Sequence, residues 1–217
     1  MQEDHRTRTA RAKRERTRSK IIEAAFQLFD DQGVDRTTVD DVRREAGLAR
    51  GSFYNYYSTY EDLLANMAAG ISLQVNLEST DLFGAVEDLK ERLSYNMRYM
   101  IKRVSSDKSC AAVVLRAIPL VGVLNTRMRE HMEAEAAEMM ARGLIRVPDV
   151  PISIEIGMGI LTSMIRRALF DGLDEKEVDD AAHMLLRAYG VDDTEAAVLA
   201  HMPVPEPAGP LRAAIKF

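Results

Sequence analysis

Between positions 50 and 55, the stretch GLARGSFYNYYSTYEDLL contains four side chains that can donate hydrogen bonds: Arg50, Ser52, Tyr54 and Asn55. An arginine guanidinium matches the paired acceptors of a guanine edge, and hydroxyl and amide groups donate to phosphate oxygens. The segment FYNYYSTY also holds four tyrosines and one phenylalanine, in a chain that has no tryptophan. These residue types indicate either a packed aromatic core or a surface that contacts nucleic acid.

Helices are expected to position this stretch. Apolar residues recur at helical spacing over 21–29, and Gly33 stands where a left-handed cap belongs, so the first helix ends near position 32. The motif TTVDD has a capping-box pattern, which predicts a second helix that runs to about Glu45. Gly47 breaks that helix, and a short third helix is expected over 49–57.

The rest of the chain repeats the helical spacing and carries almost no strand pattern. Helices are expected over 61–78, 82–104, 109–118, 121–144, 152–172 and 175–189. The segment MPVPEPAGP has four prolines in nine residues and cannot continue a helix, so it is expected to be extended or disordered. The predicted fold class is all-α.

Charge is distributed unevenly along the chain. Residues 1–20 carry eight Lys and Arg against three acids, although the net charge of the whole chain is −5. Residues 61–217 carry 17 basic against 24 acidic residues. A basic run of this kind is either a solvated tail or an arm that contacts nucleic acid.

Composition also excludes several classes of protein. No apolar run is long enough to span a membrane and no signal segment is apparent, which indicates a soluble, cytoplasmic protein. The lone Cys110 rules out a disulfide framework. The sequence has no phosphate-binding, dinucleotide-binding or GxSxG motif, so we expect no enzyme, no catalytic residue and no cofactor. His131 and His183 have acids nearby, but helix ion pairs explain these better than a metal site.

Two helices joined by a glycine turn form a helix-turn-helix candidate, whose second helix enters the DNA major groove. The run TTVDDVRREAGLARGSFYNYYSTYEDLL, with KIIEAAFQLFDDQG before it, resembles the N-terminal signature of the tetracycline-repressor (TetR/AcrR) family over residues 14–70. This resemblance implies an N-terminal three-helix DNA-binding domain and a larger helical domain for ligand binding and dimerisation. The expected division is a basic flexible arm (1–13), the helix-turn-helix domain (14–60), the helical domain (61–202) and a Pro-rich tail (203–217).

The resemblance divides the aromatic rings between core and surface. Phe53 and Tyr57 are four residues apart, so they share a helix face and are expected to pack inward, whereas Tyr54 faces the DNA backbone. Three positions depart from the family pattern: Ala49 replaces a Ser or Thr cap, Arg43 replaces a small residue, and Tyr60 replaces a Lys. The residues expected to contact DNA are Thr38, Arg43, Arg50, Gly51, Ser52, Tyr54, Asn55 and Tyr60.

The family analogy also places a small-molecule pocket between the middle helices. Methionine is frequent there, and its flexible side chain suits either an ordinary core or a pocket for apolar ligands. Pocket candidates are Tyr95, Met97, Tyr99, Met100, Leu115, Leu124, Met128, Met158 and Leu161. The last two long helices are expected to pair with a second copy as a homodimer, through the apolar residues Ile154, Met158, Leu161, Ile165, Leu169, Ala181, Met184, Leu185 and Ala188.

Three functions remain in view on the sequence alone. The first is a dimeric, ligand-responsive regulator, a repressor that a small apolar inducer releases from a palindromic double-stranded DNA operator. The second is a DNA-binding regulator of the same fold without a small-molecule inducer. The third is a helical interaction protein that does not bind DNA, in which Arg50 and Tyr54 would have no partner.

Overall fold

The structure, a computed structural model, describes residues 5–121, 126–206 and 209–215, with side chains for 8–118, 129–206 and 209–215. No strand occurs in these ranges, and the predicted all-α class is confirmed. The helices are α1 (His5–Gln32), α2 (Val39–Glu45), α3 (Tyr60–Phe83), α4 (Leu89–Ser105), α5 (Lys108–Val121), α6 (Thr126–Ala141), α7 (Val150–Phe170), α8 (Glu175–Ala188), α9 (Asp193–Ala200) and α10 (Leu211–Ala214), with two 3-10 turns, η1 (Val34–Arg36) and η2 (Phe53–Asn55).

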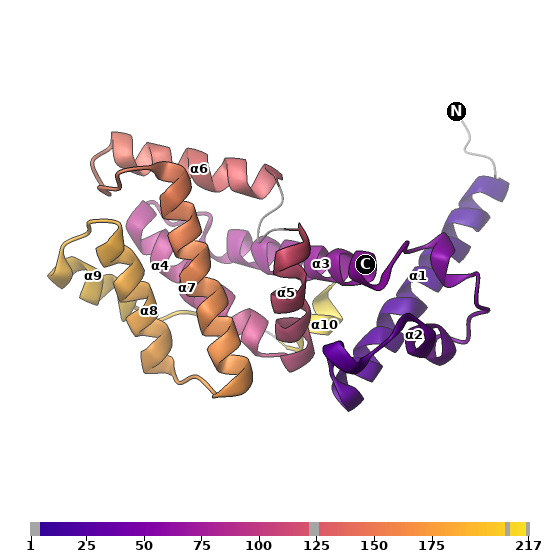
Figure 1. The fold of residues 1–217 in the computed structure, drawn as a ribbon. Helices are drawn as coiled ribbons and strands as arrows, with labels where there is room; N and C mark the ends of the chain where they lie inside the picture. Colours follow the sequence, from indigo (N-terminus) through magenta and orange to yellow (C-terminus); the bar gives the residue numbers. More distant parts are fainter. Residues whose placement is uncertain (1–4, 122–125, 207–208, 216–217) are drawn as a thin grey trace.

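The molecule has two parts that α3 connects. Figure 1 shows α1 and α2 at one end, and α3 running from there into a larger bundle of α4 to α9. The Thr59 side chain accepts a hydrogen bond from the amide of Asp62 and so caps the start of α3. Within the bundle α3 packs on α4 and α5, and α4 packs on α7 and α8.

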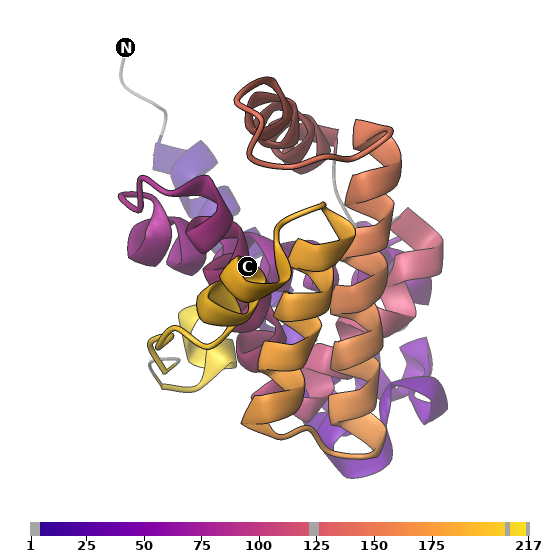
Figure 2. The same cartoon turned by 90° about the vertical axis from the view of Figure 1, so that its left-hand side faces the viewer.

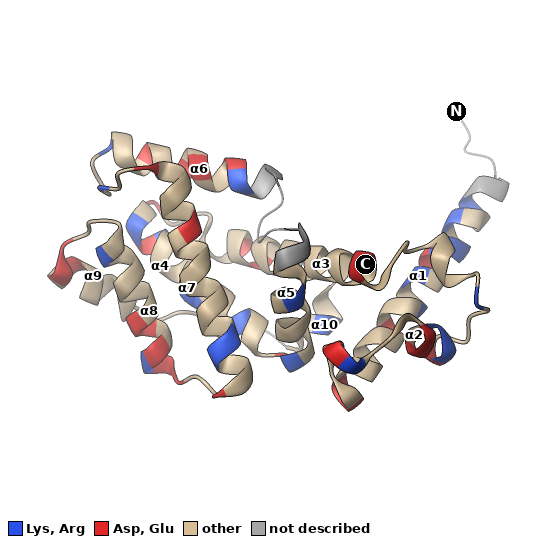
Figure 3. Cartoon of the chain, viewed as in Figure 1, with Lys and Arg blue, Asp and Glu red and all other residues tan. Residues whose placement is uncertain are grey.

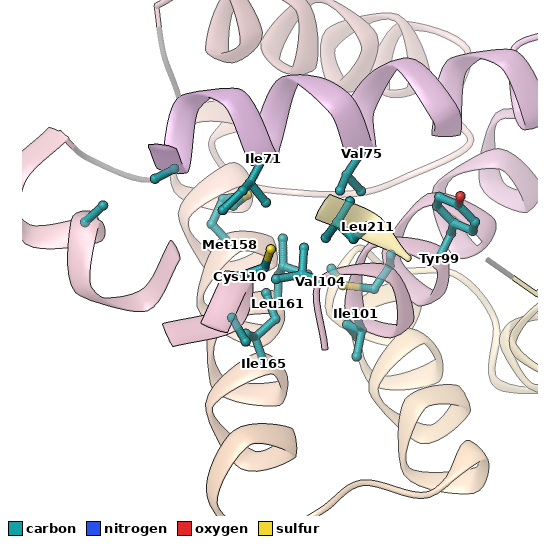
Figure 4. Close-up of a cluster of buried hydrophobic side chains, with 14 of the residues drawn as sticks. Ile71, Val75, Tyr99, Ile101, Val104, Cys110, Met158, Leu161, Ile165 and Leu211 are labelled. Carbon is teal, nitrogen blue, oxygen red and sulfur yellow. The ribbon is translucent and has the colours of Figure 1, made fainter. Parts of the chain in front are cut away.

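The core of the bundle draws apolar side chains from helices far apart in the sequence. Figure 4 shows Ile71 of α3 close to Met158 of α7, with Leu161 of α7 and Val75 of α3 in the same cluster. Cys110 of α5 lies in the same cluster and is fully buried, which raises the pKa of its thiol well above the ordinary value. The thiol is therefore protonated, as a structural cysteine should be.

The predicted flexible arm is wrong for the residues described: from His5 onward the chain is part of α1. Residues 8–16 of α1 are exposed and carry Arg8, Arg11, Lys13, Arg14 and Arg16 of the basic run, and Figure 3 shows Lys and Arg in blue along this part of the helix. The segment contains no Gly or Pro. An ion pair between Arg11 and Glu15, one turn apart, supports the helix.

The Pro-rich tail also differs from its prediction, because it returns to the core. Leu211 is fully buried and contributes to the cluster drawn in Figure 4. Residues 211–214 form α10, a single turn that packs on α3. The prolines do prevent a long helix, but they do not prevent an extended chain from being held by side chains of other elements.

Other helix boundaries differ from their predictions by several residues. The helix expected from residue 82 begins at Leu89, because the Asp88 side chain accepts from the amides of Lys90 and Glu91 and caps α4 there. The stretch Asp193–Ala200, not predicted as a helix, forms α9 with Asp192 as its cap. Short-range caps therefore set both boundaries.

Candidate nucleic-acid interface

The start of α2 has the capping box that the TTVDD motif predicts. The Thr38 hydroxyl lies 2.6 Å from a carboxylate oxygen of Asp41 and accepts from the Asp41 amide, while the Thr38 amide donates to the same carboxylate. These hydrogen bonds hold the pKa of Asp41 below its ordinary value. The hydroxyl proton of Thr38 is already used by Asp41.

A glycine turn follows α2 and sets the direction of the next segment. Gly47 has φ of 66°, a left-handed conformation that glycine adopts without strain. The Leu48 amide donates to the Arg43 carbonyl and the Gly47 amide to the Arg44 carbonyl, which is the Schellman pattern. Leu48 is thereby turned inward and is half-buried.

The recognition segment, residues 49–57, is not the α-helix that was predicted. It consists of turns around η2, with bonds from Ser52 to Ala49 and from Tyr56 to Phe53, each to the third residue back. Thr38 and Thr59 cap the helices on either side, but Ala49 has no side-chain oxygen with which to cap this one. Gly51 in the first turn weakens the helix further.

The aromatic rings of this segment are arranged as predicted. Phe53 is fully buried and its ring centroid lies 5.9 Å from that of Tyr57, which is also buried. Val42 is fully buried as well and belongs to the same core. Tyr54 points outward and its side chain is 58% exposed, so its hydroxyl is open to solvent.

A polar network that the sequence did not reveal fixes the segment against α1 and α3. The Arg18 guanidinium donates to the Tyr57 hydroxyl at 3.3 Å and to the Asn66 side-chain oxygen at 2.7 Å. Burial raises the pKa of Tyr57. Arg18 precedes Ile22 by four residues, so it shares the buried face of α1, and that spacing was the available signal.

Two arginines near the segment differ in their freedom. Arg43 donates to Asp40 at 2.8 Å and holds the pKa of that carboxyl below its ordinary value. Its guanidinium also approaches the Leu48 carbonyl, at 3.4 Å. Arg50 is exposed, and none of the described residues forms a hydrogen bond or ion pair with it. Gly51 and Asn55 are exposed beside it, and Ser52 is half-buried.

Tyr60 does not have the role expected of it. Its hydroxyl donates to the Val34 carbonyl at 2.7 Å, and burial raises the pKa of the phenol. Phosphate oxygens only accept hydrogen bonds, and the single proton of Tyr60 is already used inside the protein. Tyr60 therefore joins α3 to η1 instead of facing DNA.

The predicted ligand-pocket residues are divided between two places. Tyr95 stacks on Phe83 at 5.1 Å between centroids, and Tyr99 meets the same ring edge-on. Met158 and Leu161 instead lie in the core cluster of Figure 4. Met97 is buried, and Met100 and Leu115 are half-buried. Leu124 lies outside the described residues, as does the side chain of Met128.

Two grooves are formed by other residues. One, of about 460 Å³, lies between α1 and the C-terminal segment and is lined in part by Phe26, Asp30 and Arg212. The other, of about 280 Å³, lies between α4, α8 and residues 201–206. In neither groove does the lining include a predicted pocket residue.

The last two long helices, α7 and α8, lie side by side at the surface in Figure 2. Most of the apolar residues expected at a dimer contact, including Ile154, Ile165 and Leu185, are buried in the chain's own core. Met184, which was also expected at the contact, is 68% exposed, and Phe170 at the end of α7, which was not, is 73% exposed. Ile152 and Ile156 are also exposed on α7.

Among the described residues, no three His, Cys, Asp or Glu side chains lie close enough together to hold a metal ion. His183 lies 3.2 Å from Asp193 and so takes part in a surface pair. Glu135 pairs with Arg92 across two helices. Among the helices that the structure describes, none has both the length and the hydropathy of a membrane-spanning segment.

The chain is similar in sequence to known transcriptional regulators. A sequence model described as "Bacterial regulatory proteins, tetR family" matches residues 21–67. SrpR of Pseudomonas putida, an HTH-type transcriptional regulator, is 25% identical over 187 residues, which cover 84% of this chain and 86% of SrpR. AcrR of Shigella flexneri, also an HTH-type transcriptional regulator, is 30% identical over 60 residues, 28% of this chain and 28% of AcrR.

A solved structure extends the match in fold to nearly the whole chain. RolR in complex with resorcinol has a TM-score of 0.71 and 24% sequence identity, and the match covers 90% of this chain and 98% of the RolR chain. The fold and the site therefore define a DNA-binding transcriptional regulator of the helix-turn-helix class, not an enzyme. Residues 21–67 carry the N-terminal signature of the TetR family of bacterial regulatory proteins, as the sequence resemblance indicated.

Proposed function

We propose that the protein is a cytoplasmic homodimer that represses transcription from a palindromic operator and is released by a small apolar ligand. The observation that carries the DNA contact is the exposed Arg50, which has no polar partner among the described residues. Its guanidinium is available for a two-point contact with guanine. Tyr54, four residues on and exposed, has a hydroxyl available for a phosphate, and Ser52 and Asn55 flank it.

The N-terminal half of α1 supports a second, sequence-independent contact. Residues 8–16 are exposed there and carry five Lys and Arg of the basic run, and this helix belongs to the same unit as the recognition segment. Lys and Arg on such a helix attract phosphates and release counterions. Deleting residues 1–12 should therefore lower the slope of log K against log salt by about 0.9 for each phosphate that the deleted side chains neutralise.

The uncovered face of α7 and α8 supports dimerisation. Phe170 and Met184 are large apolar side chains in water, and exposed apolar patches mark interaction surfaces. A second copy packed against α7 and α8 would bury these two side chains. It would also supply the second recognition segment that a palindrome requires. Phe170→Glu should shift the sedimenting species toward the monomer, whereas Met140→Glu, on the exposed side of α6, should leave it unchanged.

Release by a ligand rests on the helical domain. RolR, which has a similar fold, holds resorcinol in its solved structure. Tyr95 and Tyr99 around Phe83 are candidates for an aromatic binding region at one end of α3. The Tyr99 hydroxyl already has a partner, because it donates to Glu78 at 2.9 Å, and burial raises the pKa of this phenol to about 12.

One observation favours regulation without a small-molecule inducer. Met158 and Leu161, which were expected to line a pocket, fill the core against Ile71 and Cys110. A ligand at that place would have to displace packed side chains, which costs free energy. A regulator that responds to another protein, or only to its own abundance, would need no such space.

The experiment begins with duplexes that the wild-type protein selects from a random-sequence pool. Binding of a selected, labelled duplex is then followed at rising salt, and the number of protomers per duplex is measured by sedimentation. Two protomers on a palindromic sequence are expected. Resorcinol and a panel of apolar compounds are titrated into the complex, and release identifies the inducer class. Failure to select any sequence would rule out operator binding, and selection without release would favour the alternative.

A further inference from the structure

The C-terminal segment lies along α4 and is held by three cations of that helix. The Arg98 guanidinium donates to the Met202 carbonyl at 2.6 Å. Lys102 donates to Glu206 at 2.8 Å, and the Arg103 guanidinium donates to the Gly209 carbonyl, also at 2.8 Å. The order of these contacts along α4 follows the order of their partners along the segment.

Beyond Gly209 the segment is anchored by apolar side chains. Leu211 lies beside Val75 of α3 in the core, as Figure 4 shows, and is 1% exposed. Ile215 is buried as well. The one-turn α10 begins at Leu211 and ends just before Ile215, and the Arg212 side chain reaches from it to Asp30 of α1. The path of the chain is thus fixed on both sides of Arg212.

Arg212 joins the two parts of the molecule. Its guanidinium binds both carboxylate oxygens of Asp107, at 2.5 and 2.9 Å, in the helical domain just before α5. It also binds both carboxylate oxygens of Asp30, at 2.6 and 2.7 Å, near the end of α1. The same group lies 4.8 Å from the centroid of the Phe26 ring. The planar fork of arginine permits this double contact, and a lysine ammonium does not.

Few other polar contacts cross between the described portions of the two parts. The Ser109 hydroxyl donates to Asp30 at 2.6 Å, and Arg116 of α5 pairs with Asp35 of η1 at 3.2 Å, where both side chains are exposed. The covalent connection is α3 alone. Asp30 of α1 therefore accepts hydrogen bonds from two residues of the helical domain, Ser109 and Arg212, and most of these bonds come from Arg212.

We propose that Arg212 is a positioning residue for DNA binding, which clamps α1 to the helical domain and holds the recognition segment at a fixed orientation. The proposal rests on the DNA-binding role of the helix-turn-helix unit. The helix-turn-helix unit also packs on α5 through α1 and η1, but each contact that is lost between the two parts widens the range of orientations that the unit samples, and DNA binding removes that freedom. The clamp removes part of this cost in advance, so operator binding is tighter while it is closed.

The first measurement compares Arg212→Gln with Arg142→Gln, a matched removal of charge from the exposed pair with Glu138 at the C-terminal end of α6. Affinity is measured on the duplex that the wild-type protein selects. Arg212→Gln is expected to weaken binding about tenfold, within the usual range of coupling between sites, and Arg142→Gln to leave it unchanged. Arg212→Lys, which keeps the charge without the fork, is expected to fall between them. Unchanged or tighter binding by Arg212→Gln overturns the proposal.

The second measurement separates positioning from a general loss of stability, and needs no DNA. Spin labels at Glu45→Cys, in α2, and Lys176→Cys, in α8, report the distance between the two parts by electron-spin resonance, with unlabelled protein in excess. Both positions are exposed, and Cys110 is buried and does not compete for the label. Adding Arg212→Gln should broaden the distance distribution while helical content is kept. An unchanged distribution refutes the clamp even if DNA binding itself fails.

Discussion

The helix-turn-helix unit and the helical domain differ in how far apart in the sequence the partners of their stabilising hydrogen bonds lie. In the unit, Thr38 caps α2 through Asp41, three residues on. In the helical domain, Arg103 binds the carbonyl of Gly209, 106 residues on, and Arg98 reaches a carbonyl 104 residues away. Both parts cap helices locally, but the buried cations of the helical domain also depend on contacts that form only when the whole chain has folded.

This difference matches what each part does. Local caps and a small core leave the outer face of the unit free, so Tyr54 and Arg50 can remain exposed without loss of stability. The helical domain instead buries charged groups, and each needs a distant partner to offset its desolvation. The residues proposed to contact DNA should therefore affect binding and not stability, and the buried cations should do the reverse.

The largest expected effect tests the long-range bonds. Arg103 is fully buried, with two bonds to Glu78, and Arg103→Ala should lower the free energy of unfolding by ~3–5 kcal/mol, because it leaves a partly buried carboxylate unpaired. Urea denaturation measures the change. The control is Lys176→Ala, which removes an exposed pair with Asp180 and should cost less than about 1 kcal/mol. Equal costs for the two would contradict the distinction between long-range and local bonds.

The second test concerns the free face of the unit. Arg50→Ala should relax base preference at one operator position by about 1–3 kcal/mol. Its urea midpoint should match that of the wild type, because Arg50 has no polar partner among the described residues. Competition between selected and mutated duplexes provides the measurement. If the variant keeps the full sequence preference, Arg50 does not read a base.

A smaller effect is expected where the local caps fail. Ala49→Ser supplies the missing side-chain oxygen at the start of the recognition segment and should stabilise it by about 1 kcal/mol. Slower hydrogen exchange of the Gly51 and Ser52 amides would report the cap. Ala49→Val, which has no oxygen, is the control. Equal exchange in both variants would mean that the missing cap is not why the segment is irregular.

The smallest effect is a dependence of stability on pH at the capping box. The pKa of Asp41 is lowered by its bonds with Thr38, so its ionised form stabilises the folded state. That contribution is complete above the ordinary value of 3.8 and disappears as pH falls through the lower, folded pKa. Urea midpoints measured from pH 6 to pH 2.5 should fall less steeply in Asp41→Asn. Parallel curves would show that the box adds nothing.

The same contrast explains what the sequence could predict. Gly33, Gly47 and the TTVDD motif act on their immediate neighbours, so the ends of α1 and α2 and the inward and outward rings were predictable. Arg212 forms hydrogen bonds with both Asp30 and Asp107, which lie far from it in the sequence, and no local sequence pattern indicates these contacts. The proline-rich segment was therefore predicted to be extended or disordered from its composition alone, because composition carries no information on the distant residues that hold the segment in place.

Within the unit, the errors have the same origin. Tyr60 was expected to face DNA because of its position in the motif, but Val34, 26 residues earlier, takes its proton. Arg18 was interpreted as part of the basic run, yet it is half-buried and hydrogen-bonded to Asn66 and Tyr57. The recognition segment shows the converse case, since Ala49 could be read as a missing cap and the helix is indeed irregular there.

Cys110 gives the protein a built-in reporter of internal opening. It is the chain's single thiol, and it sits at the meeting point of α3, α5 and α7, where an alkylating reagent cannot reach it. Any modification must wait for a fluctuation that parts those helices. The modification rate of the unaltered protein therefore counts such fluctuations directly, and compounds or DNA that tighten the bundle will slow it in proportion.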